Sequence, residues 1–195
     1  MNKVKVLVEG YAHPNEDGSY TASPTATLVE SNAVKFIVDP GASGEKLLKA
    51  MRDSKLRERD LAFIYLTHYH PDHFINIQLF PTLPVYDGET LWKGDLEEFH
   101  KGKLPEVEVE ILKTPGHSPE STSLLVKTPE GTVCIAADVF WWEDGKQKID
   151  DIDELLKLED PFVADKKALL KSRKLVLSKA NFVIPGHGKM FKVNK

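Results

Sequence analysis

The sequence contains a single cysteine, Cys134, so no disulfide can form within the chain. This residue stands in the apolar run 133–137, where we expect a buried and unreactive thiol. An oxidising compartment is therefore not indicated, and we expect a cytoplasmic protein. No apolar stretch approaches the roughly 20 residues that cross a bilayer, and the start MNKVKVLVEGY alternates like a strand and lacks the apolar core of a secretory signal. We expect no membrane partner.

The chain also lacks an excess of positive charge. Its 26 basic and 30 acidic residues give a formal net charge of −4, so no overall cationic field draws it to nucleic acid or anionic lipid. Hydrophobic residues make up 41% and charged residues 29%, which is a globular composition. No linker or low-complexity segment divides the 195 residues, and we expect one domain over 1–195.

Hydrophobic patterning predicts strands that alternate with a few helices. The first three strands are expected to be antiparallel, with a hairpin turn at Ser31-Asn32, and the last helix is expected to be capped by Asp160 with Pro161 at its first position. This order favours two sheets covered by outer helices over one doubly wound sheet. We expect strands at 4–9, 26–30, 34–38, 61–66, 107–112, 123–127, 132–136 and 182–184, and helices at 44–51, from 71 onward and at 161–179.

Three imidazoles and one carboxylate stand within six positions at the end of the apolar strand 61–66. Side chains two apart in an extended chain share a face, so His68 and His70 can grip one ion. Pro71 is suited to open a helix, which places Asp72 and His73 in a first turn where they can face a neighbouring metal position. Clustered histidines can also simply cap a strand, but this four-residue pattern favours metal binding.

Two further histidines each end a Pro-Gly-His tripeptide that comes directly after a predicted strand. These tripeptides are Pro115-Gly116-His117 and Pro185-Gly186-His187. Five of the seven histidines thus belong to the cluster or to these motifs, while His13 and His100 are read as surface residues. Nitrogen and carboxylate ligands suit zinc, with iron or manganese also compatible.

His68-x-His70-x-Asp72-His73, the two Pro-Gly-His motifs and Asp138 resemble, in order, the metallo-beta-lactamase superfamily over nearly the whole chain. The resemblance implies an α+β fold, a four-layer αβ/βα sandwich in which two facing mixed β-sheets carry outer helices and the site lies along one edge. It also implies two divalent metal ions. The first is bound by His68, His70 and His117, the second by Asp72, His73 and His187, and Asp138 bridges them.

The residues themselves support Asp138, because an unpaired carboxylate at the end of the apolar run 133–137 is costly and a cation compensates it; a solvated aspartate at a strand end is the alternative. Asp39 resembles the family's aspartate that hydrogen-bonds the histidine cluster, although an ordinary turn aspartate is an equal reading. The resemblance also suggests that Asp72 relays a proton to the leaving group. The residues proposed to line a substrate groove are Tyr69, Trp141 and Trp142, although the two tryptophans suit a packed lid equally well.

A dinuclear site of this kind holds a hydroxide at neutral pH, so the expected activity is hydrolysis of an ester, thioester or related bond in a small molecule. The aspartate at position 138 argues against the lactam-hydrolysing branches of the superfamily, and the histidine at position 70 argues against its flavodiiron branch. We expect no inserted or C-terminal substrate domain. One group within the superfamily, whose animal members are associated with RNA cleavage, shares the segments 137–140, 159–161, 172–174 and 183–188 with Phe191.

A phosphodiesterase or ribonuclease is therefore the first alternative, and a non-catalytic metal-binding or sensing module is the second. Ile75 replaces the family's usual glycine and is expected to narrow the approach to the metals. Solvated charge on the helices is the favoured reading of the basic side chains that an RNA would use. Those side chains are Lys166, Lys167, Lys171, Arg173, Lys174 and Lys179, with Arg52, Lys55, Arg57 and Arg59.

Overall fold

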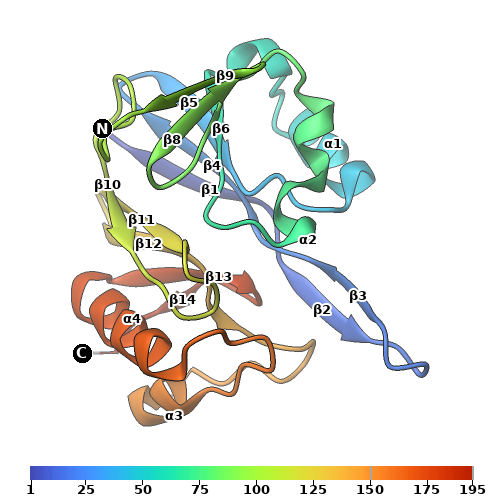
Figure 1. Cartoon of the computed structure of the whole chain (residues 1–195), viewed down its shortest axis with the longest axis vertical. Helices are drawn as coiled ribbons and strands as arrows, with labels where there is room; N and C mark the ends of the chain where they lie inside the picture. Colours follow the sequence, from blue (N-terminus) through green and yellow to red (C-terminus); the bar gives the residue numbers. More distant parts are fainter. Residues whose placement is uncertain (150, 195) are drawn as a thin grey trace.

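The structure is a computed structural model that describes residues 1–149 and 151–194; Asp150 and Lys195 of the predicted domain lie outside the described residues. Two main β-sheets face each other, and helices lie on their outer sides (Figure 1). This is the predicted four-layer sandwich, and both sheets are mixed. No helix in the described part of the chain is long and apolar enough to cross a membrane.

The N-terminal sheet has seven strands in the order β1-β4-β5-β6-β7-β8-β9. The β5–β6 and β6–β7 pairs are parallel and the other pairs are antiparallel. Asn32 and Ala33 both have positive φ and form the tight turn between β4 and β5, next to the predicted position. The strands are β1 (Lys3–Val8), β4 (Ala26–Ser31), β5 (Val34–Val38), β6 (Phe63–Tyr65), β7 (Val85–Tyr86), β8 (Thr90–Lys93) and β9 (Leu96–Phe99).

The C-terminal sheet has five strands in the order β10-β11-β12-β13-β14. Only β12 and β13 pair in parallel, and their register shifts on both sides of Ala137. The strands are β10 (Val109–Lys113), β11 (Thr122–Thr128), β12 (Gly131–Trp141), β13 (Phe182–His187) and β14 (Phe191–Lys192). A separate hairpin, β2 (Tyr11–Pro14) with β3 (Tyr20–Ser23), projects from the body of the molecule (Figure 1).

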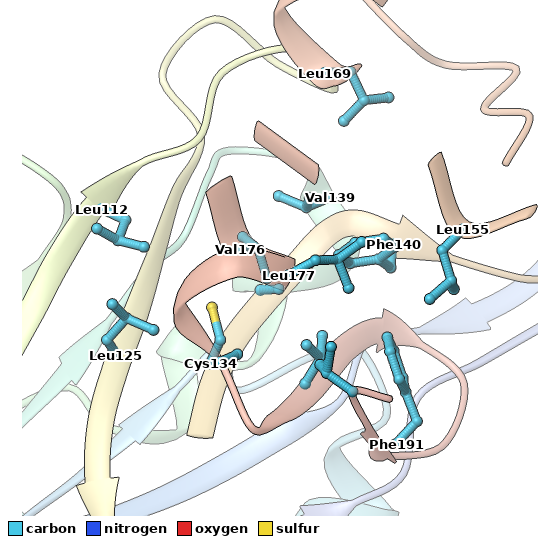
Figure 2. Packing of buried hydrophobic residues seen from close by; sticks show 14 of the residues in the cluster. Leu112, Leu125, Cys134, Val139, Phe140, Leu155, Leu169, Val176, Leu177 and Phe191 are labelled. Atoms are coloured by element: carbon cyan, nitrogen blue, oxygen red, sulfur yellow. The ribbon is translucent and has the colours of Figure 1, made fainter. Parts of the chain in front are cut away.

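Alternating side chains build three hydrophobic layers. Phe36 and Val38 of β5 point between the two sheets, while Ile37 points outward to α1 (Gly44–Asp53). The same period places Val133 and Ile135 of β12 between the sheets and Cys134 outward. There Cys134 lies in the cluster under α4 (Lys166–Lys179), with Val176 and Leu177 of that helix (Figure 2). The outer helices therefore cover opposite faces of the sandwich.

The last helix begins later than the sequence predicted. α4 starts at Lys166, where the Asp165 carboxylate accepts hydrogen bonds from two backbone N–H groups of the first turn. Asp160 and Pro161 precede the helix in an irregular segment. The same pattern, an aspartate directly before a helix, is repeated five residues later at Asp165. Because Asp160 is buried, Asp165 is left as the helix cap. Two shorter helices are α2 (Pro71–Phe74) and α3 (Ile152–Lys157), and two 3-10 turns span Glu58–Asp60 and Ile75–Leu79.

Contacts between the two ends of the chain close one edge of the sandwich. The backbone N–H of Thr25 donates to the carbonyl of Gly186 at 2.6 Å, and Gly10 pairs with Gly188 in an isolated bridge. These contacts hold the end of β13 against the N-terminal sheet, beside the predicted site.

Candidate metal centre

The seven predicted metal ligands meet at this edge from both sheets. His68 and His70 follow β6, and α2 carries the next two ligands of the cluster. His117 lies in the turn between β10 and β11, while Asp138 and His187 belong to β12 and β13.

A buried carboxylate lies at the centre of the cluster. Asp138 Oδ2 is 3.2 Å from His117 Nε2 and 3.9 Å from the Nε2 atoms of His68 and His187. Its Oδ1 is 3.3 Å from His73 Nε2. Four imidazoles thus surround one carboxylate that is only 6% exposed.

The ligand atoms divide into two groups, within each of which all of them lie within 4.8 Å of one another. His70 completes the first group, because its Nδ1 is 2.8 Å from His117 Nε2. Asp72 completes the second, with Oδ2 at 3.3 Å from His187 Nε2. The groups are His68, His70, His117 and Asp138, and Asp72, His73 and His187.

Hydrogen bonds fix which nitrogen of each ring faces this centre. His73 Nδ1 is 2.8 Å from Asp39 Oδ2, and His187 Nδ1 is 2.8 Å from the carbonyl of Tyr11. Both partners are acceptors, so each ring donates its Nδ1–H outward. In each case Nε2 is left to bind a proton or a metal ion.

The same argument holds for the first group. The Thr67 hydroxyl donates to Asp39 at 2.6 Å, so its oxygen accepts from His68 Nδ1 at 3.1 Å. His117 Nδ1 donates to Asp160 Oδ2 at 2.7 Å. Four of the five imidazoles are therefore oriented by partners outside the ligand set, an arrangement characteristic of metal-binding histidines.

Buried polar atoms provide a further test of fit to metal ions. His68 Nε2, His73 Nε2 and Asp138 Oδ1 have no hydrogen-bond partner among the described residues. Leaving such atoms unsatisfied costs about 1–3 kcal/mol each, and cations between them would remove that cost. The donor set and its orphaned atoms fit two divalent ions.

The backbone is shaped to deliver these side chains. Ala137 has φ 46° and lies in the irregular part of β12 directly before Asp138, and Asp39 has φ 48° directly after β5. Both residues occupy the left-handed region, which is strained for a side chain and is often found at functional sites. At Gly186 a Cβ atom would lie 1.7 Å from Asp138 Oδ1, so only glycine permits this approach.

The charges at the site are strongly coupled. Burial lowers the pKa of His68 well below its ordinary value, and neighbouring imidazoles lower it further. Burial opposes the charge of His73 too, but Asp138 and Asp39 together outweigh it and raise the pKa of that ring well above its usual range. His117 likewise reaches a pKa of about 9 despite burial, because Asp138 and Asp160 stabilise its cation. The carboxylates therefore favour positive charge at this edge.

Asp39 lies where the resemblance implied, against the histidine cluster. It is buried and accepts hydrogen bonds from the backbone N–H and the hydroxyl of Thr67 as well as from His73. The turn at Pro40 does not expose it to solvent. Its carboxylate therefore connects the strand end to the ring that it orients.

Asp160 is the functional residue that the sequence reasoning missed, because it was interpreted as a helix cap. It is buried, and besides His117 it accepts from the backbone N–H of Phe162 at 2.9 Å. The available signal was the Glu159-Asp160-Pro161 segment, which matches the similar group within the superfamily at a point where no helix requires an aspartate.

The three residues expected to line a substrate groove lie in different environments. Tyr69 is half exposed and lines a cleft beside His68. Trp141 is buried, and its ring centroid is 6.0 Å from that of His187. Trp142 packs against Phe140 and Phe191 in the outer core, which is the packed-lid alternative for this residue. Ile75, in place of the usual glycine, is 45% exposed.

One predicted basic side chain is not available to a polyanion. Arg173 lies on the buried face of α4, where its Nε donates to the carbonyl of Val139 at 3.0 Å and its Nη1 donates to that of Leu158. Burial lowers its pKa to about 10. Its inclusion in a basic surface was wrong, because this arginine satisfies carbonyls in the core. The lysines of α4 are exposed.

The two remaining histidines also differ from each other. His13 is exposed on the projecting hairpin, as expected for a surface residue. His100 is half-buried, with its Nε2 atom 3.0 Å from the carbonyl of Asp87 and its ring beside Tyr86. It has a packing role that the sequence did not indicate.

Two facing mixed sheets with a histidine and aspartate centre at their edge define a metallo-hydrolase type of architecture. The family model described as the metallo-beta-lactamase superfamily matches residues 21–87. Metallo-beta-lactamase domain-containing protein 1 of Xenopus laevis is 30% identical over 204 residues, which cover 100% of this chain and 83% of that protein. The Homo sapiens protein of the same name is 32% identical, covering 97% and 82%. The chain belongs to the metallo-beta-lactamase superfamily.

Other relatives share part of the chain or its fold. A Schizosaccharomyces pombe protein named as a hydroxyacylglutathione hydrolase is 31% identical, covering 57% of this chain and 46% of that protein. A metallo-beta-lactamase-type structure from Thermotoga maritima has a TM-score of 0.71 at 18% identity, covering 98% and 99%. A structure solved in a di-iron-bound form has a TM-score of 0.61 at 26% identity, covering 87% and 90%.

Proposed function

We propose that this protein is a hydrolase that uses two divalent metal ions to cleave an ester, thioester or related bond in a small molecule. Zinc is the metal that we propose for both positions. The observation that carries this proposal is the position of Asp138, whose one buried carboxylate faces the Nε2 atoms of four imidazoles. A surface cap or a structural four-ligand site would not need a carboxylate shared in this way.

The first ion would be held by His68, His70 and His117, and the second by Asp72, His73 and His187, with Asp138 between them. When bound, the ions lower the pKa of water toward about 7 and polarise the bond under attack. The chain's one thiol is completely buried and cannot act as a nucleophile here.

The chain's own groups position this chemistry. Asp39 and Asp160 hold the rings of His73 and His117 in the orientation that presents Nε2. Asp72 has a side chain that is 31% exposed, so it is the carboxylate of the cluster that a leaving group can reach. We assign it the transfer of a proton to that leaving group.

A small-molecule substrate is favoured over RNA. The burial of Arg173 removes one of the predicted phosphate contacts, and the formal net charge is −4. The name of the Schizosaccharomyces pombe relative supports a small acylated substrate. We also propose that the protein is a single domain located in the cytoplasm. Phosphodiester hydrolysis by the same centre is the second candidate, supported by the resemblance to a group whose animal members are associated with RNA cleavage.

Metal analysis combined with a substrate panel tests these alternatives. Purified protein is assayed for metal content and for turnover of generic ester, thioester and phosphodiester substrates, alongside His68→Ala and Asp138→Ala. His13→Ala is the matched control, since it removes an exposed imidazole outside the cluster. We expect two bound ions, and ester or thioester turnover that both site variants lose and the control keeps. Phosphodiester turnover alone favours the nuclease, and two ions with no turnover favour a sensor.

A further inference from the structure

A cleft of about 460 Å³ opens beside the candidate metal centre. Its inner end is formed by Thr67 and His68, and His68 is 1% exposed with an Nε2 atom that lacks a hydrogen-bond partner among the described residues. One wall comes from β8 and β9 and another from the segment 119–122. Since His68 belongs to both the cleft and the first ligand group, a molecule in the cleft lies next to that group.

The charges around this cleft have one prevailing sign. It is lined by four carboxylates and one ammonium group. The ammonium of Lys113 forms an ion pair with Glu89, and Asp87 already accepts hydrogen bonds from Tyr69 and Thr90. The two remaining carboxylates are Glu97 and Glu120. Glu120 accepts a hydrogen bond from the backbone N–H of Tyr69 at 3.4 Å, and no ion pair joins either carboxylate to a described cation. The cleft therefore keeps negative charge that its own side chains do not neutralise.

An aromatic face lies beside this negative charge. Trp92 of β8 lines the cleft and is 42% exposed, and it stands opposite Glu97 of β9 in the antiparallel register. Because it is exposed, the indole of Trp92 is accessible to a molecule in the cleft. An indole face next to a carboxylate is the combination that binds alkylammonium groups, since the ring attracts the cation and takes up its apolar surface.

We propose that this cleft binds the cationic, alkylammonium-type group of the substrate and thereby selects amine-bearing esters or thioesters. The inference rests on the proposed hydrolase function and specifies its substrate class. Trp92 and Glu97 are the residues that determine this specificity, and Glu120 adds to the field from the opposite wall. Anionic substrates, RNA included, are disfavoured at this end of the site because four carboxylates line it.

Two esters of the same shape and different charge test the proposal. The metal-loaded protein is given acetylcholine and its uncharged isostere 3,3-dimethylbutyl acetate, and kcat/KM is measured for both. We expect about a tenfold preference for the cationic ester, which is the size of a partly desolvated cation–π and ion-pair contribution. The variants Trp92→Leu and Glu97→Gln should each reduce this preference severalfold. Glu98→Gln is the matched control, because the neighbouring side chain on β9 does not line the cleft.

A binding measurement separates this inference from the hydrolase proposal. The protein contains three tryptophans, so NMR of the indole N–H groups gives three signals that can be assigned with Trp92→Phe. Titration with tetramethylammonium chloride should shift the Trp92 signal and leave the other two, whereas sodium chloride at the same ionic strength should not.

Each outcome has a definite reading. A Trp92 shift with no turnover of either ester supports the cleft assignment and refutes ester hydrolysis. Equal turnover of the two esters, or no shift with tetramethylammonium, overturns the cation assignment whatever becomes of the hydrolase. A preference that Glu98→Gln reduces as much as Glu97→Gln overturns it too, because a general surface field would then account for the effect.

Discussion

Replacing Asp39 by asparagine should weaken the binding of the metal ion at His73 without unfolding the protein. Asparagine has the same shape and tolerates the positive φ of this position better than most residues. The carboxylate, however, accepts three hydrogen bonds, from the backbone and hydroxyl of Thr67 and from His73. An amide has only one oxygen, so in either orientation its NH₂ group must face a donor.

The size of the effect follows from that mismatch. Loss of an outer partner of a metal-binding histidine usually costs 10–100-fold in metal affinity, which corresponds to about 1.4–2.8 kcal/mol. At a fixed free metal concentration above Kd, the same amount should disappear from the stabilisation that the metal gives to the folded protein. Asp160→Asn should produce a comparable loss for the ion held by His117, through its 2.7 Å hydrogen bond.

The assay is urea unfolding with and without buffered zinc, combined with chelator competition to resolve the two affinities. Asp160→Asn should weaken the ion of the first group alone. Asp39→Asn should weaken mainly the ion held by His73, with a smaller effect on the first group because Asp39 also holds the Thr67 hydroxyl that faces His68. Asp53→Asn, an exposed aspartate paired with Lys49, is the control and should change neither affinity. If Asp39→Asn retains the wild-type zinc increment, or if it weakens the ion of the first group more than the ion held by His73, the assignment of these carboxylates is refuted.

Three other perturbations have defined outcomes. Gly186→Ala should abolish the binding of one or both ions, because its Cβ would lie 1.7 Å from Asp138 Oδ1, whereas Gly44→Ala, with its nearest atom at 3.2 Å, should bind normally in the same metal titration. Burial raises the pKa of Cys134, so alkylation at pH 8 should be negligible until urea unfolds the chain, and fast labelling of the native protein would contradict the core packing. Because the folded pKa is the higher one, the contribution of this thiol to stability is complete below about pH 8.5 and decreases above it, as urea titrations between pH 7 and 10 would show. Leu124→Ala, at a completely buried position between the sheets, should lower the free energy of unfolding by about 2–5 kcal/mol, and a loss below 1 kcal/mol would mean that this layer is loosely packed.

Much of the architecture was readable from local pattern. The strand 34–38 is β5 to the residue, and the first helix was predicted from 44, where α1 begins, because alternation and turn residues act within a few positions. The ligand set was also accessible, since His68 and His70 stand two positions apart directly after a buried strand and two of the other ligands lie in repeated Pro-Gly-His motifs.

What the sequence could not supply depends on contacts between distant segments. Asp160 contacts His117 across 43 positions, and the burial of Arg173 depends on carbonyls of β12 and of the loop after α3. By pattern alone, an aspartate before a helix suits a cap and an arginine within a helix suits its solvated surface. The hairpin β2–β3 was missed because the alternation of its short strands is weak.

The closure of the sandwich by Gly10, Thr25, Gly186 and Gly188 has a consequence for the order of events during synthesis. Four of the seven ligands are complete at His73 and the N-terminal sheet is complete at Phe99, so both leave the ribosome well before His187. Until β13 arrives, that sheet lacks the Thr25–Gly186 contact and the Gly10–Gly188 bridge. The second ligand group is therefore completed last, and a nascent chain would gain its full metal affinity only after His187 has been added.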